Sequence, residues 1–361
     1  MAFRVLSLDG GGMRGLYTAT YLQCLANAFE KKRGVATLDI GAAFDLIVGT
    51  STGSIIACAL AVGVPLSRVV ELYRSKGQAI FPRRLPTDHG VLKIYRDLQK
   101  RPSALKNGTQ ALHTALGECF GAITVGELYS TRKIALAIPA IELGHHNSFV
   151  FKTAHLPNSM HRDDDYKLVD VCLASSAAPI YRSLAAIDTP GHTDAFRVFA
   201  DGGLWANNPV LVGLIDALEL TKMMDRIEIF CLGTCPRPAG ELISKEQVHR
   251  GLREWKFGGE VATLGIDTQE FAYDHMARML AKHVQRSCEI VRFPREQVPA
   301  QLMQYLDLDD TSVEARTALT AQAQKDAEMA NSRCGDDKDA EGVLVRSLFM
   351  DIPVLKEARS V

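Results

Sequence analysis

The sequence lacks a charge excess of either sign. Its 361 residues contain 41 lysines and arginines against 42 aspartates and glutamates, which gives a formal net charge of −1. Proteins that neutralise the phosphates of nucleic acids usually carry a clear basic excess. DNA and RNA are therefore not expected as partners.

The sequence also shows no pattern typical of a secretory signal or a membrane span, so neither is expected. It starts as "MAFRVLSLDGGG", a strand-like pattern, without a basic stretch followed by an apolar one. Glycines and a proline interrupt the uncharged run from Leu46 to Leu66, which predicts a strand, a turn and a buried helix. The eight cysteines are scattered along the chain, and without a secretory signal free buried thiols are expected. These absences favour a cytoplasmic location.

Strand-like and helical patterns alternate through the first two thirds of the sequence. The strand candidates are Phe3–Leu8, Phe44–Val48, Lys133–Ile141, Ser148–Phe151, Phe196–Ala200 and Arg226–Leu232. The helical candidates between them are Gly15–Phe29, Thr52–Val62, Leu66–Gly77, Thr109–Cys119, Lys167–Ala177 and Pro209–Leu220. This alternation predicts an α/β fold with a mostly parallel central sheet and helices on both faces. Ligands bind at the carboxyl ends of the strands in such sheets.

The last third of the sequence has a different character. A turn-rich stretch follows Cys235, and the clearest patterns after it are helical, over Gly259–Val284 and Ser312–Ala330. We therefore expect a catalytic α/β core over residues 1–235 and a helical C-terminal lobe over residues 236–361 that packs on the core.

The stretch "FDLIVGTSTGSIIACALAV" places Ser51 between a strand and a helix. Gly49 and Gly53 flank the serine in a G-x-S-x-G pattern, and a nucleophile elbow needs small residues at these two positions because its turn is tight. The amino end of the following helix favours developing negative charge. Ser51 is therefore a candidate nucleophile, and the alternative is a turn of small residues without chemistry.

A glycine-rich loop follows the first strand. Gly10, Gly12 and Gly15 match the G-x-G-x-x-G dinucleotide fingerprint, but Asp39, in the region where the ribose-binding acid belongs, does not end a recognisable strand. The same loop leaves backbone N–H groups uncovered, as an oxyanion hole requires. Arg14 either adds positive charge there or braces the loop by pairing with a carboxylate.

The serine needs a base, and no histidine is well placed to serve. None of the ten histidines ends a core strand in a tight loop, whereas Asp201 directly follows an apolar strand and precedes two glycines. A carboxylate can act as the base if it reaches the serine hydroxyl. Because an ordinary aspartate has a pKa of about 3.9, burial would have to raise it. The alternative is that Asp201 only forms a turn.

Four blocks of the sequence resemble those of the patatin-like phospholipases in order and approximate spacing. They are "DGGGMRG" (Asp9–Gly15), "GTSTG" (Gly49–Gly53), "ASSAAPIY" (Ala174–Tyr181) and "DGGLWANNP" (Asp201–Pro209). The resemblance covers about residues 3–235 and implies a three-layer α/β/α core with helical C-terminal additions. It implies a Ser51–Asp201 dyad without a histidine. It assigns the oxyanion loop and its basic position to Gly10, Gly11, Gly12 and Arg14.

The resemblance also implies what the enzyme acts on. It predicts a phospholipase A type acyl hydrolase that needs no metal or cofactor and associates peripherally with the inner membrane. The helical last third resembles that of bacterial antiphage effectors, which implies a cyclic dinucleotide activator, but no motif identifies its site. The loop Phe81–Gly90 is a candidate lid.

Two other classes of function stay open from the sequence. One is a dinucleotide-dependent oxidoreductase that uses the glycine loop, and the other is a binding protein built on an inactive patatin fold. The sequence leaves self-association into a homo-oligomer open as well.

Overall fold

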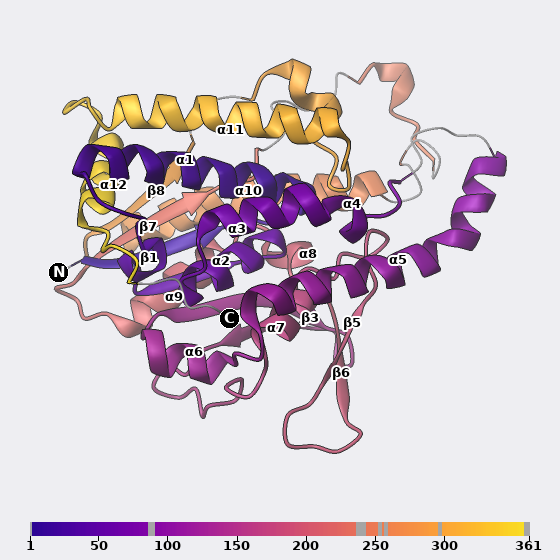
Figure 1. Ribbon diagram of the computed structural model, residues 1–361, viewed down its shortest axis with the longest axis horizontal. Coiled ribbons are helices and arrows are strands. Elements are labelled where there is room, and N and C mark those ends of the chain that lie inside the picture. Colours follow the sequence, from indigo (N-terminus) through magenta and orange to yellow (C-terminus); the bar gives the residue numbers. More distant parts are fainter. Residues whose placement is uncertain are drawn as a thin grey trace.

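One mixed sheet organises the molecule (Figure 1). The computed structural model describes residues 2–85, 91–235, 243–251, 255, 259–294 and 298–356. In these residues the sheet has the strand order β5-β6-β3-β2-β1-β7-β8, and β4 pairs with β3. The strands are β1 (Ala2–Leu8), β2 (Leu46–Gly49), β3 (Ala135–Glu142), β4 (Asn147–Lys152), β5 (Ala185–Asp188), β6 (Phe196–Asp201), β7 (Arg226–Leu232) and β8 (Cys288–Phe293).

Helices cover both faces of the sheet. They are α1 (Gly15–Arg33), α2 (Thr52–Val62), α3 (Leu66–Glu71), α4 (Gly77–Ile80), α5 (Val91–Phe120), α6 (Val125–Arg132), α7 (Leu168–Ser175), α8 (Gly203–Ala206), α9 (Val210–Leu220), α10 (Gly259–His283), α11 (Val313–Arg333) and α12 (Ala340–Asp351). One face carries α1, α2 and α7, with α11 packed along α1, and the other carries α9 and α10. The three-layer α/β/α fold expected from the sequence is confirmed.

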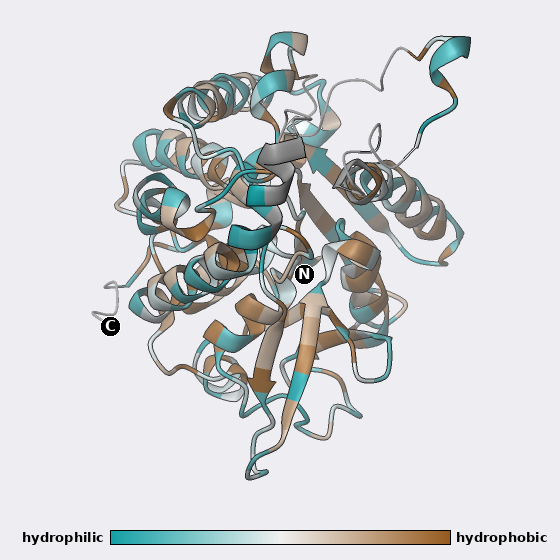
Figure 2. Cartoon of the chain, turned by 90° about the vertical axis from the view of Figure 1, so that its right-hand side faces the viewer, coloured by the Kyte–Doolittle hydropathy of each residue, from teal (hydrophilic) through white to brown (hydrophobic). Residues whose placement is uncertain are grey.

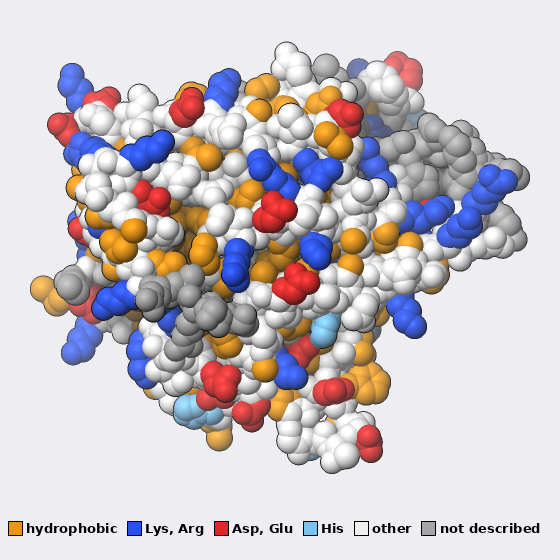
Figure 3. Space-filling view, in the orientation of Figure 1, with side chains coloured by type: hydrophobic (Ala, Val, Ile, Leu, Met, Phe, Trp, Pro, Cys, Tyr) orange, Lys and Arg blue, Asp and Glu red, His pale blue; other side chains and the backbone are white. Residues whose placement is uncertain are grey.

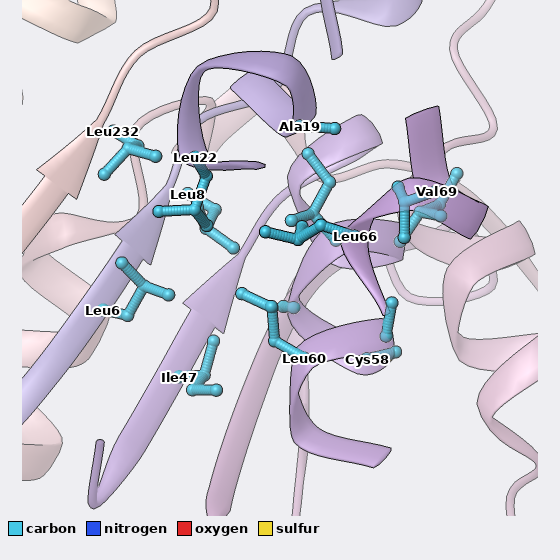
Figure 4. Close-up of a cluster of buried hydrophobic side chains, with 14 of the residues drawn as sticks. Leu6, Leu8, Ala19, Leu22, Ile47, Cys58, Leu60, Leu66, Val69 and Leu232 are labelled. Carbon is cyan, nitrogen blue, oxygen red and sulfur yellow. The ribbon is translucent and has the colours of Figure 1, made fainter. Parts of the chain in front are cut away.

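The alternation of side chains along the strands explains the two apolar layers. In β1, Leu6 and Leu8 face α1 and α2, whereas Val5 faces α9 (Figure 4). Both sets are fully buried, because helices cover both faces of the sheet. Hydrophobic residues accordingly follow the strands and the inner sides of the helices, while polar residues cover the outside (Figure 2). The visible face in Figure 3 carries charges of both signs between isolated apolar side chains.

The antiparallel edge of the sheet places the loop after β6 beside the end of β2. Strand β2 pairs in parallel with the first residues of β3, from Leu46 opposite Ala135 onward. Strand β3 then continues past the end of β2, and β6 runs back along this extension, with Asp201 opposite Ala140. The end of β6 therefore returns to the end of β2, and two distant loops meet there.

The structure contains elements that the sequence patterns did not indicate. Strand β8, from the last third of the chain, extends the sheet beside β7, and β5 pairs with β6. Helix α5 begins at Val91, well before the predicted Thr109, and passes through Pro102. The predicted boundary near residue 236 stays a prediction, and residues beyond it also contribute to the sheet. No helix in the described part of the chain is long and apolar enough to cross a membrane.

Candidate active site

Ser51 lies in the turn between β2 and α2 in an uncommon backbone conformation. Its φ is 53° and its ψ is −121°, which is rare for a residue other than glycine and typical of strained functional turns. A Cβ atom on Gly53 would lie 2.3 Å from the Leu8 carbonyl oxygen, and one on Gly49 would lie 2.3 Å from the Gly53 carbonyl oxygen. The two glycines therefore allow the turn to be as tight as a nucleophile elbow requires.

Asp201 is the hydrogen-bond partner of the serine hydroxyl. Ser51 Oγ donates to Asp201 Oδ2 at 2.8 Å, and the Gly203 N–H donates to Asp201 Oδ1 at 2.6 Å. Both side chains are buried. The sequence predicted this pair from two separate loops, and the structure brings them together through the extension of β3.

Burial raises the pKa of Asp201 to about 6. The hydrogen bonds from Gly203 and Ser51 and the positive charge of Arg182 oppose this rise, but the loss of hydration outweighs them. A carboxylate with this pKa is largely ionised at neutral pH and still accepts a proton more readily than an exposed aspartate. These are the properties that a general base needs.

The glycine loop lies across the pocket from Asp201. The Gly10 N–H donates to the Asn207 carbonyl oxygen at 2.9 Å, and the Gly10 carbonyl oxygen accepts from Thr234 Oγ1 at 3.0 Å. Among the described residues, the N–H groups of Gly11 and Gly12 donate no hydrogen bond, and both residues line the pocket with Ser51. Gly11 and Gly12 therefore offer free donors for a carbonyl oxygen that becomes negative, whereas the Gly10 N–H is already occupied.

Arg14 lies behind the loop in the interior of the protein. Its Nε donates to the Gly11 carbonyl oxygen at 3.4 Å, and its Nη2 lies 3.7 Å from Asp267 Oδ1 on α10. The bracing role that the sequence left open is the one that these contacts support.

The pocket above Ser51 is narrow and mainly apolar. Its apolar lining consists of Ile55, Ile80, Phe81, Leu112, Ile266 and Leu308. The enclosed volume is about 40 Å³, far below the roughly 300–1,000 Å³ of most small-molecule sites. This conformation therefore leaves too little room for an acyl chain above the serine.

Two residues of the "ASSAAPIY" region have roles that the sequence did not reveal. Ser175 Oγ accepts from the Ser51 N–H at 2.9 Å and donates to the Pro139 carbonyl oxygen at 2.7 Å, so it holds the nucleophile turn in place. Arg182, which directly follows the block, lines the pocket with a buried guanidinium. A cation placed immediately after this block of small residues was the available signal.

Three arginines in and near the candidate lid Phe81–Gly90 form ion pairs with aspartates. Arg83 and Arg101 both pair with Asp97, and Arg84 pairs with Asp307. Residues 86–90 of the candidate lid lie outside the described part of the chain. Across the described residues, no group of three or more histidine, cysteine, aspartate or glutamate side chains is placed to hold a metal ion.

Comparisons with known proteins identify the family. Residues 6–214 match the family model of the patatin-like phospholipases, a span that includes both glycine-flanked turns and Asp201. A cGAMP-activated phospholipase of Pseudomonas aeruginosa is 34% identical over 278 residues, covering 76% of this chain and 74% of that protein. One from Escherichia coli is 30% identical over 333 residues, covering 89% and 88%. One from Vibrio cholerae is 37% identical over 215 residues, covering 58% and 56%.

Among solved structures, human GIVD cytosolic phospholipase A2 is similar with a TM-score of 0.45 and 10% identity, covering 96% of this chain and 60% of that one. The assignment rests on the sequence matches, which also remove the dinucleotide-dependent oxidoreductase as an alternative. The chain therefore belongs to the patatin-like phospholipase family and is a lipid ester hydrolase.

Proposed function

We propose that the protein cleaves the acyl esters of membrane phospholipids with a Ser51–Asp201 dyad. The observation that carries this proposal is the 2.8 Å hydrogen bond from Ser51 Oγ to a buried carboxylate, within an apolar pocket that contains two free backbone N–H donors. Asp201 takes the hydroxyl proton as Ser51 Oγ bonds to the ester carbonyl carbon. The N–H groups of Gly11 and Gly12 stabilise the resulting oxyanion.

The second half of the reaction returns the enzyme to its starting state. The tetrahedral intermediate collapses, the bond to the lysolipid oxygen breaks, and this oxygen takes the proton from Asp201. Asp201 then removes a proton from water, which attacks the acyl carbon, and Ser51 leaves with that proton as the fatty acid is released. Neither half of this reaction needs a group beyond the dyad, the loop and water.

We further propose that cGAMP activates the enzyme by opening the pocket. The names of the relatives support this ligand, and the small pocket supports a closed resting state. Two segments close the pocket through Phe81 and Leu308, and contacts between them hold it shut: Arg84 Nη1 lies 3.0 Å from Asp310 Oδ2, and the Leu85 N–H donates to Asp309 Oδ2 at 2.7 Å. An activator that binds the open state more tightly shifts the population toward it.

The activity test is fatty-acid release from phosphatidylglycerol vesicles, with and without cGAMP. We expect cGAMP-dependent release by the wild type and a loss of about 10³-fold or more in Ser51→Ala. Ser176→Ala is the matched control, because Ser176 lines the same pocket but its Oγ donates to the Cys172 carbonyl oxygen. Equal release by the wild type and Ser51→Ala would exclude Ser51 as the nucleophile. Silence of the wild type under every condition would favour the inactive binding protein.

We also propose that helix α10 docks the enzyme on the bilayer. Its outer side exposes a row of apolar side chains, called the α10 apolar face here: Val261, Leu264, Phe271, Met276, Met279 and Leu280. The acidic side chains described on α10, at Asp267, Glu270 and Asp274, point inward to arginines, and Lys282 and His283 are exposed at its end. An apolar face with a basic end suits an anionic lipid surface.

The position of α10 relative to the pocket supports a lipid as the occupant of this face. Ile266, on the same helix, lines the pocket that contains Ser51, so docking through α10 brings the pocket close to the membrane. The sequence resemblance and the α10 apolar face together support the membrane association and the predicted location at the inner membrane. The predicted role in antiphage defence rests on the resemblance.

Vesicle flotation tests the docking face. We expect Leu264→Glu/Phe271→Glu to lose binding to phosphatidylglycerol vesicles and to lose release from them, while hydrolysis of a water-soluble short-chain ester persists. Met224→Glu is the control, because Met224 is 95% exposed outside α10. Unchanged flotation with a smaller particle in solution would instead assign the face to a second copy of the chain.

A further inference from the structure

Arg182 carries an unpaired buried guanidinium in the active-site pocket. The side chain is 6% exposed, and neither Nη1 nor Nη2 has a hydrogen-bond partner among the described residues. A buried charged group without partners destabilises a protein, because it loses its hydration without compensation. An anionic ligand that enters the pocket can supply the missing partners.

Arg182 stays charged in the pocket that it lines together with Asp201. Arg182 and Asp201 are the charged residues among those that line the pocket. Burial lowers the pKa of Arg182 to about 10, although the negative charge of Asp201 opposes this shift. The guanidinium also lies 5.8 Å from the centre of the Phe81 ring. It is therefore a cation at neutral pH, and the Phe81 ring and the Asp201 carboxylate are among its neighbours.

A neighbouring arginine shows what a bracing role looks like in the same region. Arg101 Nε bonds to Asp97 Oδ2 at 2.6 Å, and Arg101 Nη1 and Nη2 donate to the carbonyl oxygens of Ile180 and Arg84. Arg101 thus uses all three of its nitrogens for structural contacts, one of them with the segment that leads to Arg182, and it does not line the pocket. The two terminal nitrogens of Arg182 make no comparable hydrogen bonds with the described residues.

We propose that Arg182 binds the phosphate of the phospholipid substrate. The planar guanidinium fork offers two parallel donors that match two phosphate oxygens. In a glycerophospholipid the phosphate is attached to the same glycerol as the scissile ester, so one pocket can hold the ester at Ser51 and the phosphate at Arg182. This inference rests on the proposed function and deepens it, because it makes Arg182 the residue that favours phospholipids over neutral acylglycerols.

A comparison of two substrates tests the role of Arg182. The assay measures kcat/KM for dioleoyl phosphatidylglycerol and for dioleoylglycerol in the same detergent micelles, with saturating cGAMP, at pH 8.5, where Asp201 is ionised. We expect Arg182→Gln to lower the phospholipid-to-diacylglycerol ratio by about 10- to 100-fold, with Arg182→Lys in between. The matched control, Arg101→Gln, should lower both values in the same proportion.

A binding measurement tests the role of Arg182 in proteins that cannot catalyse the reaction. Calorimetry compares the binding of a short-chain phosphatidylglycerol, below its micelle concentration, to Ser51→Ala and to Ser51→Ala/Arg182→Gln. We expect the double variant to bind about tenfold more weakly or worse. Equal binding by the two proteins would overturn the inference even if the wild type proved inactive, and a wild type that cleaves neither substrate would overturn the proposed function alone.

The remaining outcomes separate Arg182 from other sources of the same effect. An equal fall for both substrates would show that Arg182 acts through Asp201 or the fold, and would overturn the inference. An unchanged ratio with a higher half-activating concentration of cGAMP would assign the guanidinium to the phosphates of the activator instead of those of the lipid.

Discussion

Two buried aspartates stand at the ends of two different strands of the sheet, and they have different partners. Asp9 follows β1 and Asp201 ends β6, and both are almost completely enclosed. Burial raises the pKa of Asp9 to about 7 and that of Asp201 to about 6. Similar burial and similar pKa values therefore do not by themselves show which carboxylate takes part in catalysis.

The arginine beside each aspartate marks the difference. Arg292 Nη1 lies 2.7 Å from Asp9 Oδ2, and its Nε lies 3.1 Å from Asp274 Oδ1, so the pKa of Arg292 is raised well above its ordinary value by these carboxylates despite burial. Arg182 faces Asp201 without a hydrogen bond, and burial lowers its pKa. Arg292 is engaged in a structural network under the glycine loop, whereas the terminal nitrogens of Arg182 have no hydrogen-bond partner among the described residues.

The largest expected difference between the two aspartates is in the rate. Asp201→Asn removes the carboxylate that we propose as the base for Ser51, so kcat should fall by about 10³-fold or more. Asp9→Asn keeps an oxygen for Arg292 and leaves the Ser51–Asp201 bond in place, so kcat should fall by less than about tenfold. The measurement is ester hydrolysis under saturating substrate for both variants. Equal losses would mean that Asp9 also takes part in the chemistry.

The local part of the site could be predicted from the sequence. The turn at Ser51 and the glycine loop each lie within one strand–turn–helix stretch. The small residues that each turn needs are therefore close together in the sequence. Asp201 was found by its place after an apolar strand and by the family resemblance. Its route to Ser51 was not predictable, because it depends on how far β3 extends past β2.

The parts that the sequence did not reveal depend on contacts between distant residues. Strand β8 contains Glu289 and Arg292, which weaken its apolar pattern, yet the Arg292 side chain is only 15% exposed, because it pairs with Asp9, 283 positions earlier. Arg182 is buried partly against Phe81, about a hundred positions away along the chain. The local signal, a cation directly after a block of small residues, does not record such pairings, and for this reason the place of Arg182 in the pocket was missed.

The second prediction concerns the free energy of unfolding, which substitutions of Arg292 and Arg182 should change in opposite directions. Arg292→Met leaves Asp9 and Asp274 without their shared cation, and breaking such a buried network typically costs about 3–5 kcal/mol. Arg182→Met removes a buried charge whose two terminal nitrogens have no hydrogen-bond partner in the described part of the chain, so the free energy of unfolding should rise by about 1 kcal/mol. Urea unfolding at pH 8 measures both. A destabilised Arg182→Met would show that Arg182 braces the fold.

The pH dependence of the destabilisation by Arg292→Met shows whether it comes from lost charge pairing. Because the pKa of Asp9 is raised to about 7, Asp9 is mostly protonated at pH 5 and needs its cation less there. The destabilisation by Arg292→Met should therefore be smaller at pH 5 than at pH 8. A loss that does not change with pH would point to lost packing instead of lost charge pairing.

The smallest expected effect is a shift in the pH–rate profile, and it separates the two aspartates most directly. The base works in its ionised form, so kcat/KM for a neutral ester should rise through pH about 6 and level off above it. The positive charge of Arg182 lowers the pKa of Asp201, so Arg182→Gln should move the midpoint upward by less than about one pH unit. Asp9→Asn should leave the midpoint in place, because Asp9 titrates without contact to Ser51. A midpoint that instead disappears in Asp9→Asn would assign the titration to the Asp9 network, and the dyad would then lose its kinetic signature.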